Sequence, residues 1–146
     1  MNKALLFVVL AVALAGCGKT QPPVGKWEGG TEAGGNLVVA RVEILPNGQV
    51  KVMAPDITNA VGPRERVNEL RARLAADLVN GWSEVTPRSF DFDGKTFRKP
   101  GGIAPQMVWD KSTNQMTLEL YIGAQPAMPV PLRPVDDFHD NPFGAG

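Results

Sequence analysis

The sequence predicts a mainly β domain of the α+β class, with about eight short antiparallel strands and one amphipathic helix. Several segments alternate apolar and polar residues, a pattern that is typical of half-buried strands. Short turn signals separate these segments, and consecutive hairpins favour an antiparallel sheet. One stretch, at about 63–80, has a helical period instead. We therefore expect a bent sheet or small open barrel with this helix packed on it.

The first strands are predicted at 25–29 and within 37–53. The segment 25–29 reads GKWEG and begins the folded part. Between 37 and 45, one face collects the apolar side chains Val38, Ala40, Val42 and Ile44, and the other holds Arg41 and Glu43. Asn47-Gly48 favours a type I′ turn, because both central positions of that turn need positive φ. The chain then returns over 49–53 and completes a hairpin.

The amphipathic helix is predicted from spacing and from its end signals. Its apolar residues recur three and four positions apart, at Val67, Leu70, Leu74 and Leu78. Pro63 suits the first helical turn, and Asn80-Gly81 suits the end of the helix. The other faces carry four arginines, at Arg64, Arg66, Arg71 and Arg73. These side chains form either a functional basic face or an ordinary solvated surface.

Strand patterns return after the helix. Asp93-Gly94 is predicted to form a second two-residue turn, which would place Phe97 opposite Phe90 across the ladder. The segments 106–110 and 115–122 are predicted to form a third hairpin, because the second arm alternates clearly.

The last strand is predicted at 128–132. Pro129, Pro131 and Pro134 lack the N–H that a sheet ladder needs, so we expect this strand at an edge of the sheet. A single globular domain is therefore assigned to 25–135. Residues 136–146 show no periodicity and are predicted to form a loosely ordered acidic tail.

The first residues have the features of an export signal. Lys3 gives the start a positive charge, and the run Ala4–Leu14 holds no polar residue. A helix that crosses a bilayer needs about 20 apolar residues. This shorter run is typical of a signal peptide instead. We predict that residues 1–16 are a cleaved signal.

Leu14-Ala15-Gly16-Cys17 resembles the lipobox, the motif that ends bacterial lipoprotein signal peptides. The resemblance implies a diacylglycerol on the Cys17 sulfur, cleavage before Cys17 and an N-acyl chain on the new amino terminus. Two or more acyl chains give stable anchoring. An ordinary secretory signal that ends near a cysteine is the alternative. Residues 17–24 would form the lipidated cysteine and a short tether.

Gly18 bears on which membrane holds the anchor. In enterobacterial lipoproteins an Asp at this position is associated with retention in the inner membrane, and this chain has Gly there. The resemblance therefore implies an anchor in the outer membrane, with the domain facing the periplasm. The inner membrane is the alternative.

Composition excludes several classes of function. Without residues 1–16, which hold one basic residue, the chain has 130 residues with 14 basic and 15 acidic side chains, and the signs are interspersed. A nucleic-acid surface needs a basic patch or stripe, so no nucleic-acid partner is predicted. Cys17 is the sole cysteine, and lipidation would use it. Neither a disulfide nor a cysteine metal site is then predicted.

Gly25-Lys26-Trp27 resembles the G-x-W that opens the first strand of lipocalins. In that family the tryptophan closes one end of a barrel, and a basic residue from late in the chain packs on it. The resemblance implies that Arg133 packs on Trp27 in a cation–π contact. It also implies an apolar small molecule bound in the barrel mouth. This chain departs from the family in its length and in the mid-chain position of its helix.

Few residues suggest chemistry. His139 is the only histidine and lies in the acidic tail, where a metal site or a catalytic triad would lack a rigid geometry. The segment 91–94 lacks the ligand spacing of an EF-hand loop. We predict no enzyme activity, no metal and no cofactor beyond the acyl chains on Cys17. Trp82 and Trp109 are either core residues or an interaction surface, because aromatic residues are enriched where proteins meet partners.

Three functions follow as expectations. The first is a non-enzymatic binding or scaffolding module that acts on a protein of the cell envelope. The second is a lipocalin-like carrier of an apolar small molecule, which needs an internal cavity. The third is an inhibitor or immunity lipoprotein against a lytic enzyme or toxin, for which the acidic tail is the only candidate element.

Overall fold

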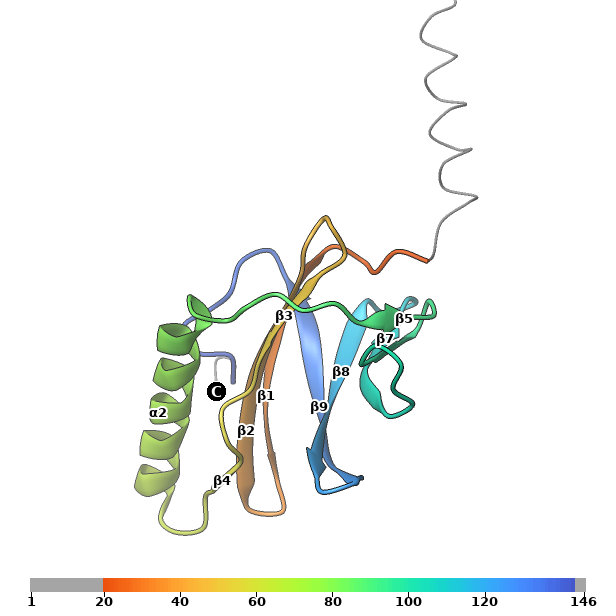
Figure 1. The fold of residues 1–146 in the computed structure, drawn as a ribbon. Helices are drawn as coiled ribbons and strands as arrows, with labels where there is room; N and C mark the ends of the chain where they lie inside the picture. Colours follow the sequence, from red (N-terminus) through yellow and green to blue (C-terminus); the bar gives the residue numbers. More distant parts are fainter. Residues whose placement is uncertain (1–19, 144–146) are drawn as a thin grey trace, which may run out of the picture.

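A computed structural model describes residues 20–143 of the chain. The predicted signal 1–16, the lipidation residue Cys17 and the last residues, 144–146, lie outside this range. The described part is mainly β, as predicted: a curled antiparallel sheet forms a half-barrel, and one helix packs on its outer side (Figure 1). The helix is α2 (Arg64–Trp82), which begins after Pro63 and extends slightly beyond the predicted end.

The sheet has nine strands, joined in the order β3-β2-β1-β9-β8-β7-β6-β5, with β4 also paired to β2. Every pair is antiparallel, as consecutive hairpins require. The two ends of this order, β3 and β5, do not pair with each other, so the barrel stays open on one side. The strands are β1 (Gly25–Ala33), β2 (Asn36–Ile44), β3 (Val50–Met53), β4 (Thr58–Asn59), β5 (Asp91–Phe92), β6 (Thr96–Arg98), β7 (Pro105–Asp110), β8 (Gln115–Ile122) and β9 (Gln125–Val135).

The concave side of the sheet holds the larger apolar core. The predicted alternation in β2 is confirmed, because its even-numbered residues point into this side. The core joins both halves of the sheet, which is why the sheet curls around it. Its buried members are Trp27, Val38, Ala40, Val42, Ile44, Val50, Phe97, Met107, Met116, Leu118, Val130 and Leu132.

The convex side of β1 and β2 holds a second core, beneath α2. The apolar stripe of the helix meets the odd-numbered residues of β2, so this strand is buried on both faces. The sequence pattern predicted only the concave set for this strand. The buried members of the second core are Leu37, Val39, Ala60, Leu70, Leu74 and Leu78.

Two predictions about hairpins are wrong in detail. The β2–β3 turn has positive φ at Gly48 but not at Asn47, and Gly48 N donates to Leu45 O at 2.9 Å. This geometry fits a three-residue turn with a glycine bulge and not type I′. In the β5–β6 hairpin, Phe97 pairs with Phe92 and not with Phe90.

The last strand, β9, lies inside the sheet between β1 and β8, and the predicted edge position is wrong. Its register explains how prolines are tolerated there. The ladder between β1 and β9 covers only residues 133–135 of β9. Pro129 and Pro131 lie in the earlier stretch, which pairs with β8 alone. The missing N–H groups of these two prolines therefore leave no bond to β1 unmade. Pro134 lies within the β1 ladder, where it pairs with Trp27.

The acidic tail also differs from its prediction. Residues 136–143 have no regular secondary structure, but they lie against the convex side of the sheet and the end of α2 (Figure 1). The ring of Phe138 meets Trp82 edge-on at 5.0 Å between centroids, and Phe143 packs against the second core. Phe138 and Phe143 account for this packing, because the first contacts Trp82 and the side chain of Arg41 and the second covers part of the apolar core under α2.

Candidate functional site

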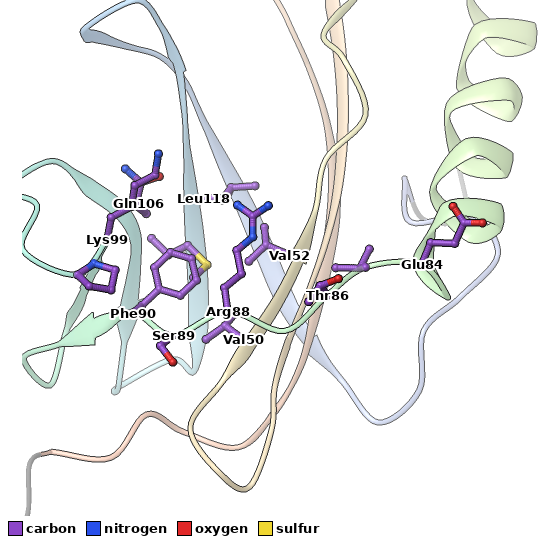
Figure 2. A pocket seen from close by; sticks show the side chains of 13 residues that line it. Val50, Val52, Glu84, Thr86, Arg88, Ser89, Phe90, Lys99, Gln106 and Leu118 are labelled. Carbon is purple, nitrogen blue, oxygen red and sulfur yellow. The ribbon is translucent and has the colours of Figure 1, made fainter.

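The open side of the half-barrel forms a groove of about 740 Å³ between β3 and the later strands (Figure 2). We use "the groove" for this cavity throughout. Its volume is within the range of about 300–1,000 Å³ that is typical of small-molecule sites. The lining residues are Val50, Val52, Glu84, Val85, Thr86, Arg88, Ser89, Phe90, Lys99, Pro100, Gln106, Met107 and Leu118.

The linker 83–90 creates the groove by crossing from the end of α2 to β5. It joins the free edge of β3 at one point only, where Val50 N donates to Arg88 O at 2.8 Å and Arg88 N donates to Val50 O at 2.9 Å. Alternate residues of a strand direct their backbone groups to the same side, so those of Val52 also point to this open edge. The bridge fixes the backbone of Arg88 beside the groove. The rest of the seam, which is the gap between the free edge of β3 and the linker, stays open.

The floor of the groove is apolar. Val50 and Met107 are fully buried, and Val52 and Phe90 are partly buried beside them. Phe90 is held edge-on against Phe97, with ring centroids 6.5 Å apart. Val50 and Met107 are already out of water, so the apolar surface that a ligand can cover comes from Val52 and Phe90. Such surface gains about 25 cal/mol per Å² when it leaves water, so these two side chains favour an apolar occupant.

The mouth of the groove carries more positive than negative charge. In Figure 2 the Arg88 side chain reaches between Val52 and Phe90, while Glu84 lies apart from it at the end of α2. Lys99 lines the opposite side of the groove. None of the ion pairs found within residues 20–143 involves Arg88 or Lys99. These two cations are therefore available to an acidic group in the mouth.

A second, more polar depression of about 550 Å³ adjoins the groove. The N-terminal segment Thr20–Pro22 lines it, together with the β2–β3 turn and residues Ser89–Phe92. Ser89 and Phe90 line both cavities, so the groove ends where the N-terminal segment crosses the molecule.

The structure separates Trp27 from Arg133, so the contact implied by the lipocalin resemblance does not form. Trp27 is buried in the concave core, and its Nε1 donates to the main-chain oxygen of Asn114 at 2.8 Å. Arg133 pairs across the ladder with Glu28, and Trp27 pairs with Pro134. Because neighbouring residues of a strand point to opposite faces, Arg133 lies on the convex side, away from the indole.

Trp82 and Trp109 are both half-buried and lie on different sides of the sheet. Trp82 ends α2 on the convex side, with Lys51 Nζ at 4.5 Å from its ring centroid. Trp109 lies on β7, where its Nε1 donates to Asn114 Oδ1 at 2.9 Å. The structure does not bring the two indoles together into one surface.

Sequence reasoning missed a polar cluster on the convex side, under the tail. The Glu28 side chain is fully buried and accepts a hydrogen bond from His139 N at 2.7 Å. Arg133 Nη2 and His139 Nδ1 lie at 3.4 Å and 3.2 Å from the same carboxylate. No signal in the sequence distinguishes Glu28 and Arg41 from the other charged residues of the same strands, which are Lys26, Glu32 and Glu43.

Arg41 belongs to the same cluster. Its Nη2 donates to His139 O at 2.9 Å, and its guanidinium lies 4.7 Å from the Phe138 ring centroid. Burial lowers the pKa of Arg41 from its usual value, and the carboxylates of Glu28 and Asp140 oppose this shift. The tail thus covers the charged residues of this face and supplies their partners.

The described residues contain no group of three or more His, Cys, Asp or Glu side chains that could hold a metal ion. Over residues 20–143, no helix has the length and apolar character needed to cross a membrane. Comparison of the chain with protein-family models, with curated proteins and with solved structures gives no match.

Proposed function

We propose that this chain is a lipid-anchored, non-enzymatic binding protein that takes an acidic amphiphile into the groove. The ligand would place its apolar part against Val52 and Phe90 on the floor and its anionic group beside Arg88 and Lys99. The anchor is the acyl-modified Cys17, in the outer membrane on the periplasmic side. The observation that carries the proposal is the combination of an apolar floor with two cations that lack ion-pair partners at the mouth.

The two parts of the groove would contribute differently. Each buried CH₂ contributes about 0.8 kcal/mol, so the floor would supply most of the affinity. A hydrogen bond to a charged group contributes about 1.5–3 kcal/mol. Because Arg88 and Lys99 are exposed to solvent, the lower end of that range applies. The mouth would therefore set selectivity for an acidic head group, and the floor would set affinity.

The groove supports the carrier function more than the other two expectations. A scaffolding module for an envelope protein needs an exposed aromatic surface, and Trp82 and Trp109 lie apart. An inhibitor needs a projecting acidic element, whereas the tail lies along the sheet, with Asp137 at 3.5 Å from Lys26. A small amphiphile fits the site that the described residues form.

The test is a binding measurement with a matched pair of ligands. The processed full chain is placed in phosphatidylcholine nanodiscs and titrated by calorimetry with a medium-chain alkyl carboxylate and with the neutral amide of the same chain. Empty nanodiscs give the blank. We expect saturable binding of both ligands, with the carboxylate bound about tenfold more tightly, which corresponds to about 1.4 kcal/mol.

The double variant Arg88→Gln, Lys99→Gln identifies the source of that preference. It should remove the preference for the carboxylate and leave the affinity for the amide unchanged. Lys111→Gln, a charge change in the β7–β8 turn, is the matched control and should behave like the unmodified chain. If neither ligand saturates, or if the carboxylate preference survives the double variant, the proposed function is wrong.

A further inference from the structure

The N-terminal segment crosses the open seam of the half-barrel at one end. A Cβ built on Gly48 would lie 3.4 Å from Gln21, and one built on Gly94 would lie 3.8 Å from Thr20. The segment thus reaches from the β2–β3 turn to the β5–β6 turn (Figure 1). Both turns flank the place where the groove and the second depression share Ser89 and Phe90.

Chain length limits how far this end can lie from the anchor. Cys17 precedes Thr20 by three residues, and three extended residues span at most about 11 Å. The β1–β2 and β8–β9 turns lie at the other end of the sheet (Figure 1). The nine residues of β1 separate the two ends by about 30 Å. An anchor at Cys17 therefore holds the Ser89–Phe90 end of the groove near the bilayer. The β1–β2 and β8–β9 turns lie at the end of the sheet that points away from it.

We infer that the groove opens toward the membrane that anchors the chain and takes an anionic lipid amphiphile directly from that bilayer. The inference rests on the proposed function and on lipidation of Cys17. Direct transfer keeps the apolar part of the ligand out of water, because the Ser89–Phe90 end of the groove lies beside the segment that leads to the anchor. Arg88 is next to Ser89 and would meet the anionic head group as it leaves the surface.

Orientation is tested first, without any ligand. Intact mass establishes that Cys17 carries its acyl chains, and a chain without them would overturn the inference. Lys95→Cys in the β5–β6 turn and Gln125→Cys at the far end are then labelled with a fluorophore in vesicles that contain spin-labelled lipid. Both sites are exposed, and the introduced thiol is the only one that remains free in a lipidated chain. We expect quenching at Lys95→Cys and little at Gln125→Cys; equal quenching, or the reverse order, overturns the inference.

Uptake is tested by lengthening the tether. A Gly-Ser insertion of roughly 25 residues between Lys19 and Thr20 should slow the uptake of a fluorescent long-chain carboxylic acid from the vesicles about tenfold. The reason is that effective concentration falls with at least about the −3/2 power of tether length. The affinity for the soluble alkyl carboxylate should not change.

The readouts distinguish the two proposals. An unchanged uptake rate, with normal affinity in solution, overturns the inference and leaves the proposed function standing. If the unmodified chain does not bind the soluble carboxylate, the proposed function is wrong. In that case the membrane-transfer inference falls with it, whatever the quenching shows.

Discussion

Charged residues have different surroundings on the two sides of the half-barrel. On the convex side, Glu28 and Arg41 are buried under residues 136–143, which supply their hydrogen-bond partners. On the concave side, Arg88 stands at the mouth of the groove without an ion-pair partner among the described residues. The tail therefore completes one side of the sheet, and the other side is left with an apolar floor and free charge. This difference is why we assign ligand binding to the concave side.

The largest expected effect is a loss of stability, caused by a substitution in the buried cluster on the convex side. Glu28→Gln keeps the shape of the side chain and one oxygen to accept from His139 N, but it removes the negative charge and places an NH₂ group beside the Arg133 guanidinium. Arg133 is 45% exposed and can be solvated, but Arg41 is buried and loses the carboxylate charge that opposes its own. Removing one partner of a buried charged pair costs about 3–5 kcal/mol, so urea denaturation should show a loss of unfolding free energy of that size.

Glu69→Gln is the matched control for this change. Glu69 lies on the exposed side of α2, and surface charges contribute about 0–1 kcal/mol. Equal losses for the two variants would show that the buried cluster has no special role on the convex side.

The next effect is a loss of ligand affinity, caused by a larger side chain in the groove on the concave side. Val52→Trp places an indole over the groove floor and should weaken binding of the alkyl carboxylate roughly hundredfold, or about 3 kcal/mol. The unfolding free energy should change by less than about 1 kcal/mol, because the side chain is only partly buried.

Ile122→Trp tests whether the position of the added indole matters. Ile122 is 72% exposed at the far end of β8 and does not line the groove. The same change in size there should leave ligand affinity as it is. If Val52→Trp binds normally by calorimetry, the ligand site lies elsewhere.

The smallest effect is a local change at low pH in the β5–β6 turn, which lies at the Ser89–Phe90 end of the groove. Hydrogen bonds from Thr96 N, the Arg98 guanidinium and Lys95 N lower the pKa of Asp93 from 3.8 to about 2. A lowered folded pKa means that the stabilisation is fully present above pH 3.8 and is lost as the pH falls toward about 2. Backbone amide chemical shifts of Lys95 and Thr96 should report this loss over that interval.

Asp93→Asn should remove the acid response of those two amides. Asp110 offers a comparison within the same sheet, because Ser112 lowers its pKa in the β7–β8 turn, away from the groove. If the Lys95 and Thr96 amides respond only near neutral pH, Asp93 does not hold this turn.

The sequence was sufficient for features that depend on local pattern. The alternation in β2, the helix at α2 and the hairpin at Gly48 arise from residues that are close together along the chain. The pairing of Glu28 with Arg133 depends instead on how β1 meets β9, which the sequence separates by about a hundred residues. No local signal gives that register, so the expected contact between Trp27 and Arg133 could not be checked in advance.

The groove could not be predicted for a related reason. The linker 83–90 has no strong strand pattern, and its one bridge to Val50 depends on where α2 packs. The packing of the tail could not be predicted, because Phe138 and Phe143 are isolated among polar residues and form no periodic apolar pattern. The position of the groove beside the N-terminal segment depends on the turns at Gly48 and Gly94, which are far apart in the sequence and lie next to that segment in the fold.

The bridge between Val50 and residue 88 uses main-chain atoms only. The backbone at position 88 therefore keeps its place whichever side chain it carries, apart from proline, which lacks the N–H donor. Head-group preference can then change by a single substitution without rebuilding the scaffold. Under the proposed function, a glutamate at position 88 would leave the main-chain bridge intact and favour cationic over acidic amphiphiles, so selectivity would vary without a change in the fold.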